Sequence, residues 1–317
     1  MRESSMSAQI GYLIPTREAI MEGRPSAKPL MRLAIAAEDL GYDSVWIGDS
    51  LTARPRHEPL TLLSGIAGAT NRVKLGTAVL LPALRNPVLL AHTVATLDQV
   101  SDGRVILGYG IAGDVPNIRA EFESAGVPFE KRIGRMLEGL QVCRALWSGD
   151  KVDWDGRWKL AGQEIGPTPV QVGGPPIWIG GSHANALKRA ARHFDGWFPT
   201  GPGADVCGQQ WQEVQAHAKT EGRSGDDMTF AVYLTLALDD NHDAGIARID
   251  KFLEAYYGVP GHLLRRRMAS FGGPAEEAAA FVRGYVEQGA SHICIRFAGD
   301  HENSLKAMAT LRKEMKG

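Results

Sequence analysis

Residues 73–107 read VKLGTAVLLPALRNPVLLAHTVATLDQVSDGRVIL and hold one complete structural unit. Residues 73–79 are apolar and rich in β-branched side chains, which predicts a strand. Residues 88–100 carry apolar side chains at helical spacing, and Ser-Asp-Gly then turns the chain into a second apolar strand at 104–107. A strand, a helix and a strand in succession form a unit whose two strands run parallel.

The same unit recurs along the chain of 317 residues. Further strands are expected at 9–14, 44–47, 176–179, 196–199, 228–238 and 291–297. Further helices are expected at 29–40, 59–70, 132–147, 184–193, 206–221, 243–257, 274–288 and 303–315. Eight strands alternating with helices favour a closed (β/α)8 TIM barrel, an α/β fold, over an open sheet. The active site of such a barrel lies at the carboxyl ends of its strands.

One domain spanning 1–317 is expected, because no linker divides the chain. Residues 1–8 are expected to be a tail. Two segments are expected to be loop insertions: 148–175, with a polar hairpin around Asp155-Gly156, and 258–273, with three consecutive arginines. The second insertion lies at the barrel mouth and is either a mobile lid or a solvated charged loop.

Composition excludes several classes of function. The 35 Lys and Arg residues against 36 Asp and Glu residues give a formal net charge of −1, so nucleic acid and anionic membranes are not expected partners. The longest apolar stretch, 75–91, is interrupted by Pro82, Arg85 and Pro87, and a spanning helix needs roughly 18 uninterrupted residues. The polar N-terminus lacks the apolar core of a signal peptide, so a cytoplasmic location is expected.

Cysteine and histidine spacing gives no sign of a metal site. The three cysteines, Cys143, Cys207 and Cys294, are far apart and form no C-x-x-C pair. The nine histidines show no H-E-x-x-H spacing. We therefore expect reduced thiols and no metal.

A glycine turn after the fifth strand is the strongest local signal of a binding site. The segment WIGGS at 178–182 leaves a strand and enters a helix, with Ser182 placed to cap it. Free N–H groups around Gly180 and Gly181 would form a phosphate cradle, although a tight turn without a ligand has the same sequence. Thr200, in the turn after the next strand, is expected to complete the cradle with its hydroxyl.

Two other motif matches point to different functions. The segment GYGIAG at 108–113 fits G-x-G-x-x-G, but Pro116 follows where a dinucleotide-binding helix should begin, which argues against a Rossmann site. The segment GGSHA at 180–184 is similar to the nucleophile elbow of serine hydrolases, with Ser182 as nucleophile and His292 or His301 as base. Its last glycine is replaced by Ala184, so a hydrolase is a remote alternative.

Ten motifs follow one another in a characteristic order. They are AEDLGYDSVWIGD at 37–49, LGTAV at 75–79, ATLD at 95–98, GRVILGYG at 103–110, EF at 121–122, the segment 132–138, LW at 146–147, WIGG at 178–181, DGW at 195–197 and GGPAEE at 272–277. Together they resemble the bacterial luciferase-like superfamily of flavin- and deazaflavin-dependent oxidoreductases. The resemblance covers nearly all of the chain.

This resemblance implies a (β/α)8 barrel with reduced FMN, or alternatively coenzyme F420, across its mouth. The cofactor phosphate would be held after strands five and six, where the glycine turn lies. A non-prolyl cis peptide at Ala78-Val79, preceded by Thr77, would lie under the ring. The residues after strand four, Gly110, Ala112 and Gly113, would line the ring or its side chain, and small side chains there permit close approach.

The chain departs from the family after strand two, where many relatives carry a histidine following Asp or Glu. This chain has Asp49-Ser50. Asp49 is the candidate catalytic residue, although a strand-end aspartate also commonly caps a loop, and His57 is a second candidate from the same loop. The missing histidine weakens an assignment to the F420-dependent sugar-phosphate dehydrogenases.

Ser50 and two strand-end tyrosines, Tyr12 and Tyr109, are candidates for substrate binding. Either tyrosine is equally well explained as a packed rim residue.

The resemblance thus predicts an enzyme. The main expectation is an FMN-dependent monooxygenase that receives reduced flavin from a separate reductase and uses O2 to oxygenate a small organic substrate. The alternative is hydride transfer with F420, and a flavin-storage or binding barrel is more remote. A homodimer is expected from the family.

Overall fold

The computed structural model describes residues 8–316, with side chains described through Arg312, so most of the expected tail lies outside it. Eight parallel strands close into a barrel. They are β1 (Gln9–Leu13), β2 (Ser44–Ile47), β3 (Lys74–Leu80), β4 (Val105–Tyr109), β7 (Ile177–Ile179), β8 (Gly196–Trp197), β9 (Thr229–Leu238) and β11 (His292–Phe297). Pairing of β8 with β9 and of β11 with β1 completes the ring. The expected fold is confirmed.

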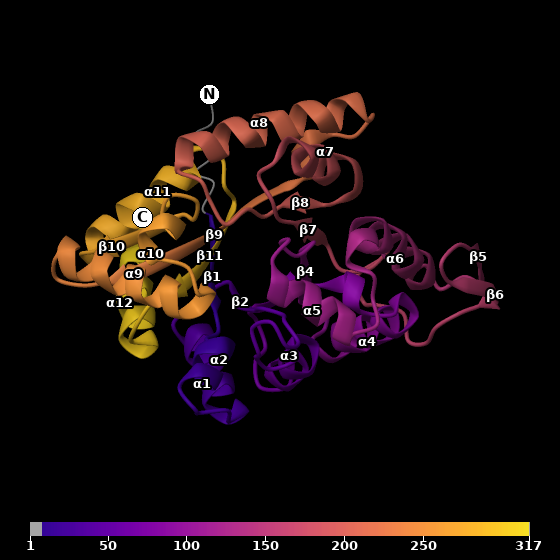
Figure 1. Ribbon diagram of the computed structural model, residues 1–317, viewed down its shortest axis with the longest axis horizontal. Helices are drawn as coiled ribbons and strands as arrows, with labels where there is room; N and C mark the ends of the chain where they lie inside the picture. The colour runs from indigo at the N-terminus through magenta and orange to yellow at the C-terminus, as the bar shows by residue number, and fades with distance from the viewer. Residues whose placement is uncertain (1–7, 317) are drawn as a thin grey trace.

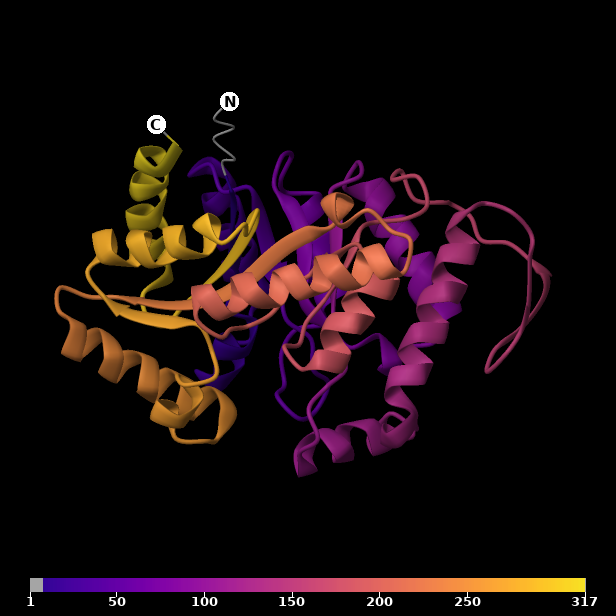
Figure 2. The ribbon, with the colours of Figure 1, turned by 90° about the horizontal axis from the view of Figure 1, so that it is seen from above.

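Helices connect the strands and cover the outside of the barrel (Figures 1 and 2). Those that were expected are α2 (Ala27–Asp39), α3 (Pro59–Ala67), α4 (Pro87–Val100), α6 (Arg132–Trp147), α7 (Ala184–His193), α8 (Ala204–Thr220), α9 (His242–Tyr257), α11 (Ala275–Glu287) and α12 (His301–Lys316). Three more, α1 (Thr16–Met21), α5 (Pro116–Ser124) and α10 (Gly261–Leu264), were not predicted as separate helices. Prolines at the first turn of α3 and α4 match the preference of that position for a residue without an N–H.

Alternation along the strands divides the core into two layers. One set of side chains packs outward against the helices. The other fills the barrel axis and comprises Leu13, Trp46, Ile106, Trp178, Phe198, Ala231, Tyr233 and Cys294. The Trp46 ring occupies room left by Gly76, because a Cβ there would lie 2.1 Å from Trp46 Cε3. The rings of Trp46, Trp178 and Phe198 meet in tilted and edge-to-face contacts and close the barrel below its mouth.

The segment 258–273 is partly regular structure and not only a loop. It contains α10 and a further strand, β10 (Ser270–Gly273), which pairs parallel with the last four residues of β9. The reason lies in strand length, because β9 has ten residues and its neighbour β8 pairs with only the first two. The remaining edge of β9 would expose unpaired backbone groups, and β10 covers it.

The other insertion contains the expected polar hairpin. Strands β5 (Val152–Asp155) and β6 (Lys159–Gln163) pair antiparallel and lie beyond α6 at the edge of the molecule (Figures 1 and 2). The hairpin is remote from the barrel axis, so it does not shape the mouth.

None of the helices within residues 8–316 is both long and apolar enough to traverse a lipid bilayer. Over the same residues, no three His, Cys, Asp or Glu side chains lie close enough together to hold a metal ion.

Candidate functional site

A cavity opens at the carboxyl ends of the barrel strands, where the fold predicts an active site. Its lining comes from the end of β3, from the segments that follow β2, β3, β4 and β8, from α5 and β9, and from the end of α9. The expected site residues among the lining are Asp49, Ser50, Ala78, Val79, Gly110, Ala112, Gly113 and Thr200. Expected residues of four separate segments thus meet in one cavity.

One wall of the cavity is small and apolar. The peptide bond between Ala78 and Val79 is cis, as the resemblance implied. Gly110 packs against it so closely that a Cβ would lie 2.5 Å from Val79 Cγ2. Ala112 has a φ of 60°, in the left-handed region that non-glycine residues rarely adopt. Thr77 lies behind this wall, fully buried, and its hydroxyl donates to the Gly108 carbonyl at 2.9 Å, so it does not line the cavity.

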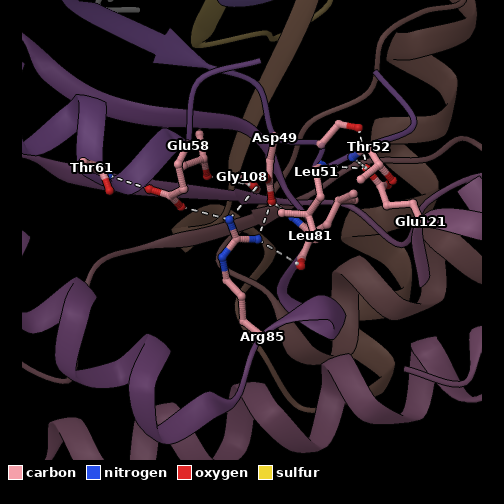
Figure 3. Close-up of polar contacts among 11 residues, drawn as sticks. Asp49, Leu51, Thr52, Glu58, Thr61, Leu81, Arg85, Gly108 and Glu121 are labelled. Carbon is pink, nitrogen blue, oxygen red and sulfur yellow. Dashed lines mark hydrogen bonds and ion pairs between the residues drawn. The ribbon is translucent and has the colours of Figure 1, made fainter. Parts of the chain in front are cut away.

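Asp49 ties the ends of β2 and β3 together (Figure 3). Its Oδ2 accepts from the Leu81 N–H at 2.9 Å, and both of its oxygens accept from the Arg85 guanidinium. Arg85 also donates to Glu58 Oε1 at 2.9 Å, and Glu58 in turn accepts from the Thr61 N–H at the start of α3. The Asp49 side chain is only 1% exposed. Its carboxylate is therefore engaged by a fixed counter-ion, an arrangement suited to positioning the loop.

Glu121 organises the loop after β2 and was singled out in the sequence only as part of a family motif. Its Oε1 accepts from the Ser50 hydroxyl at 2.6 Å and from three consecutive backbone N–H groups, those of Leu51, Thr52 and Ala53 (Figure 3). The side chain comes from α5 and is buried. Ser50, which stands where many relatives carry a histidine, is thus a hydrogen-bond donor to a buried carboxylate.

The glycine turn at 180–182 adjoins the cavity without lining it. The Ser182 hydroxyl donates to the Gly201 carbonyl at 3.0 Å, which joins this turn to the one that contains Thr200. The Trp197 indole donates to the Gly181 carbonyl at 2.8 Å. The prediction that Ser182 caps α7 is wrong, because His183 is the capping residue and accepts from the Asn185 N–H.

The hydrolase alternative has no support in this geometry. His292 shares hydrogen bonds with Ser44 and Gln9 inside the barrel, and His301 shares one with Tyr12. Over the described residues, neither imidazole contacts Ser182, whose hydroxyl donates to a backbone carbonyl.

Tyr12 and Tyr109 do not face the cavity, so the expectation that they contact substrate is not met. Both are fully buried on the outer side of the barrel. Tyr12 packs against Phe297, and its hydroxyl lies 2.9 Å from His301 Nδ1. The cause is strand alternation: Leu13, the residue next to Tyr12, points to the axis, so Tyr12 points to the helices.

The other candidate histidine and the candidate lid also lie apart from the cavity lining. His57 Nε2 lies 2.8 Å from the Pro25 carbonyl. In the segment 258–273, Arg265 pairs with Asp250 of α9 at 2.6 Å.

Several lining residues were not predicted from the sequence: Arg54, Arg56, Leu81, Ile118, Phe198, Tyr233, Tyr256 and Tyr257. Alternation could have identified Tyr233, because it lies in β9 two residues after Ala231, which faces the axis. Tyr256 and Tyr257 end α9, and nothing in a helical pattern shows that its last turn reaches the mouth.

Comparison with known proteins identifies the family. The family model described as luciferase-like monooxygenase matches residues 8–315. The chain is 28% identical over 300 residues to an F420-dependent glucose-6-phosphate dehydrogenase of Mycobacterium avium, covering 86% of this chain and 88% of that protein. It is 32% identical over 228 residues to the Mycobacterium tuberculosis (strain H37Rv) protein described by the same words, covering 69% and 67%.

Solved structures share the fold at low sequence identity. An F420-dependent secondary alcohol dehydrogenase in complex with an F420-acetone adduct has a TM-score of 0.82 at 19% identity, over 96% of this chain and 98% of that one. The monooxygenase RslO1 from Streptomyces bottropensis has a TM-score of 0.79 at 20% identity, with the same coverage. The family match, the barrel and the cavity together establish that the chain belongs to the luciferase-like monooxygenase family and is an oxidoreductase.

Proposed function

We propose that the protein is a coenzyme F420-dependent oxidoreductase that transfers hydride between the deazaflavin and a small organic substrate. The observation that carries this proposal is the similarity, over 86% of the chain, to a relative described as F420-dependent. The main expectation from the sequence, an FMN-dependent monooxygenase, has less support, and the F420 alternative takes its place.

The residues present suit a flat tricyclic ring. The cis peptide and the side chains of Ala78 and Val79 form an apolar wall, and Gly110 keeps the opposite backbone close to Val79. A Cβ at Gly113 would meet no atom within 4 Å, so the backbone there borders open space. In this proposal these residues hold the deazaflavin, and Thr200 with the turn at 180–182 holds its phosphate. When bound, the cofactor supplies a ring carbon that accepts or donates hydride.

The chain's own residues would position the reactants and exclude water. Asp49 and Arg85 fix the ends of β2 and β3, and Glu121 holds Ser50 and the residues after it. Leu81, Ile118 and Phe198 add apolar surface around the cavity. Over the described residues, no histidine lines the cavity, so no imidazole is placed there to act as acid–base. The catalytic role of Asp49 stays a prediction, and its pairing with Arg85 favours positioning.

A turnover assay tests the proposal. The purified protein is mixed with oxidised F420 and a panel of alcohols and sugar phosphates, including glucose 6-phosphate, and in reverse with reduced F420 and carbonyl compounds. The parallel arm uses reduced FMN and O2 with the same panel. We expect substrate-dependent change in deazaflavin absorbance and no oxygenated product in the FMN arm. Oxygenated product from FMN, without F420 turnover, would refute the proposal.

The expected homodimer and separate reductase stay predictions. A dehydrogenase that reduces F420 takes the electrons from its own substrate, so it needs no separate electron donor. The reduced F420 that it forms would then serve reductases that use this cofactor.

A further inference from the structure

Four arginines gather around two tyrosines on one side of the cavity. Tyr256 and Tyr257 end α9 and line the cavity. The guanidinium carbons of Arg17, Arg56 and Arg296 lie 5.0, 5.6 and 4.8 Å from the Tyr256 ring centroid. Those of Arg54 and Arg296 lie 5.1 and 5.6 Å from that of Tyr257. Aromatic faces stabilise cations, so the tyrosines hold the four charges together.

This arginine–tyrosine cluster, Arg17, Arg54, Arg56 and Arg296 with Tyr256 and Tyr257, has almost no negative charge of its own. Among the described residues, none of the four guanidinium groups forms an ion pair with a carboxylate. Arg85, Arg119, Arg248 and Arg265 elsewhere in the chain each pair with an aspartate.

Glu18, which interacts electrostatically with Arg17, Arg56 and Arg296, compensates the cluster poorly. Glu18 of α1 is buried, and its Oε1 has no hydrogen-bond partner within the part of the chain that the structure describes. Burial raises its pKa, which favours the neutral form. Arg17 Nε is also buried, and it has no hydrogen-bond partner among these described residues. Unpaired cations held partly out of water are costly unless an anion completes them.

Two of the arginines carry guanidinium N–H groups that are available to a ligand in the cavity. Arg54 and Arg56 both line it. Among the described residues, the one hydrogen bond from their guanidinium groups runs from Arg56 Nε to the Arg54 carbonyl. Arg296 is different: it donates to Thr235 Oγ1 and to the Tyr257 hydroxyl and is fully buried. Arg296 therefore positions Tyr257, and Arg54 and Arg56 are the groups left to bind a ligand.

Arg56 also lies beside the proposed ring site. A Cβ on Gly48 would be 2.3 Å from Arg56 Nη1 and 3.3 Å from the Ala78 carbonyl oxygen. Gly48 thus leaves room for the guanidinium next to the cis peptide. A group bound by Arg56 would consequently neighbour whatever lies on Ala78 and Val79.

We propose that Arg54 and Arg56 form a subsite for an anionic group, a phosphate or carboxylate, of the substrate, so that the substrate class is an organic anion. The planar guanidinium fork matches both anions through paired hydrogen bonds. This inference rests on the proposed function, because it places the anion beside the cofactor. The same chemistry occurs in the phosphate and carboxylates of the F420 tail, which is a second source of such a group.

Calorimetric titration with inorganic phosphate at constant ionic strength tests the subsite on the full chain. It is run on the free protein, on the protein saturated with F420, and on the protein saturated with the same deazaflavin lacking its phosphate tail. The variants are Arg54→Gln, Arg56→Gln and the charge-retaining Arg56→Lys. Arg283→Gln, on the exposed surface of α11, is the matched control because it removes the same charge. Thermal unfolding of each variant establishes that it is folded.

We expect saturable phosphate binding that persists with F420 bound. Each glutamine variant should weaken it by about tenfold or more, Arg56→Lys should weaken it less, and Arg283→Gln should leave it unchanged. Equal phosphate affinity in the glutamine variants, or no saturable binding by the native chain, would overturn the proposal. Displacement of phosphate by F420 but not by the tail-less deazaflavin would also overturn it, since the cluster would then serve the cofactor.

Failure of the subsite is distinguishable from failure of the proposed function. If F420 binds and phosphate does not, the F420-dependent activity stands and the subsite is wrong. If phosphate binds through Arg54 and Arg56 while neither deazaflavin binds, the anion site stands and the proposed cofactor is wrong.

Discussion

The carboxylate of Asp49 and the guanidinium of Arg85 act together in this structure, and a double-mutant cycle tests whether they act as one unit. Asp49→Asn and Arg85→Gln each break the same ion pair, so each should lower kcat/KM by about tenfold or more. Because the two losses share one cause, the double variant should be little worse than the poorer single one.

A proton-transfer role for Asp49 gives a different pattern. Asp49→Asn alone would then abolish turnover and remove one limb of the pH–rate profile, whereas Arg85→Gln would retain both. Steady-state kinetics across pH on the four proteins separates these outcomes.

Glu121 is expected to matter for the order of the loop after β2 more than for overall folding. Glu121→Ala removes the acceptor of four hydrogen bonds, and we expect a loss of about 1–3 kcal/mol in the free energy of unfolding. Residues 50–58 should also become accessible to protease. Glu123→Ala, two residues along the same helix and exposed, is the control and should change neither measurement. Unaltered proteolysis of the Glu121 variant would contradict the role assigned here.

His292 gives the stability of the barrel a pH dependence. Burial lowers the pKa of His292 to about 3, below the ordinary value of 6.5. The folded protein therefore keeps this imidazole neutral while the unfolded chain takes up a proton, so stability is lost as pH falls from about 6.5 toward 3. Between pH 7.5 and 5 the loss from this residue should be about 2 kcal/mol.

Urea unfolding of His292→Gln at the two pH values checks this expectation. The variant should lose less stability on acidification than the native chain, whatever its absolute stability. His262→Gln, at an exposed site in α10, should keep the native pH dependence. An identical slope in the His292 variant would mean that its imidazole is protonated in the folded state.

At the scale of elements, α9 crosses β10 closely because Gly245 of α9 and Gly272 of β10 have no side chains. A Cβ on Gly245 of α9 would lie 2.3 Å from the Gly273 N and 2.5 Å from the Gly272 C, so backbone would have to move. Gly245→Ala should therefore destabilise by about 1–3 kcal/mol, although alanine is the better helix former.

Gly284 of α11 is also a glycine within a helix, but there is room for a Cβ at this position. A Cβ there would meet the Ala204 Cβ at 3.7 Å, an ordinary contact. Gly284→Ala should therefore stabilise by up to about 1 kcal/mol through helix propensity alone. Denaturant unfolding of both variants gives the signs, and a stabilised Gly245→Ala would show that the crossing is loose.

Most elements could be predicted because hydrophobic periodicity is a local property. All eight barrel strands and nine of the helices follow patterns that the sequence displays directly. Strand β10 escaped prediction because its cause is not local: it covers an edge of β9 that is exposed only because β8 is short. Tyr12 and Tyr109 were misplaced for a related reason, since one residue of register decides which side of a strand faces the axis.

At the scale of the whole molecule, the site could be predicted where it follows from strand ends and family motifs. Asp49, Ala78, Val79, Gly110 and Thr200 do line one cavity. The arginine–tyrosine cluster could not be predicted, because it joins α1, the loop after β2, α9 and β11 through tertiary contacts. Sequence periodicity carries no information on how such distant segments meet.

Comparative binding of the two cofactors tests the central claim most directly. The protein is titrated anaerobically with F420 and with FMN, each oxidised and reduced, and the same titrations are made on Gly110→Val, whose side chain would collide with Val79. We predict saturable one-to-one binding of F420, FMN weaker by about tenfold or more, and loss of F420 binding in the variant. Tight FMN binding with no affinity for F420 would contradict the account and restore the monooxygenase.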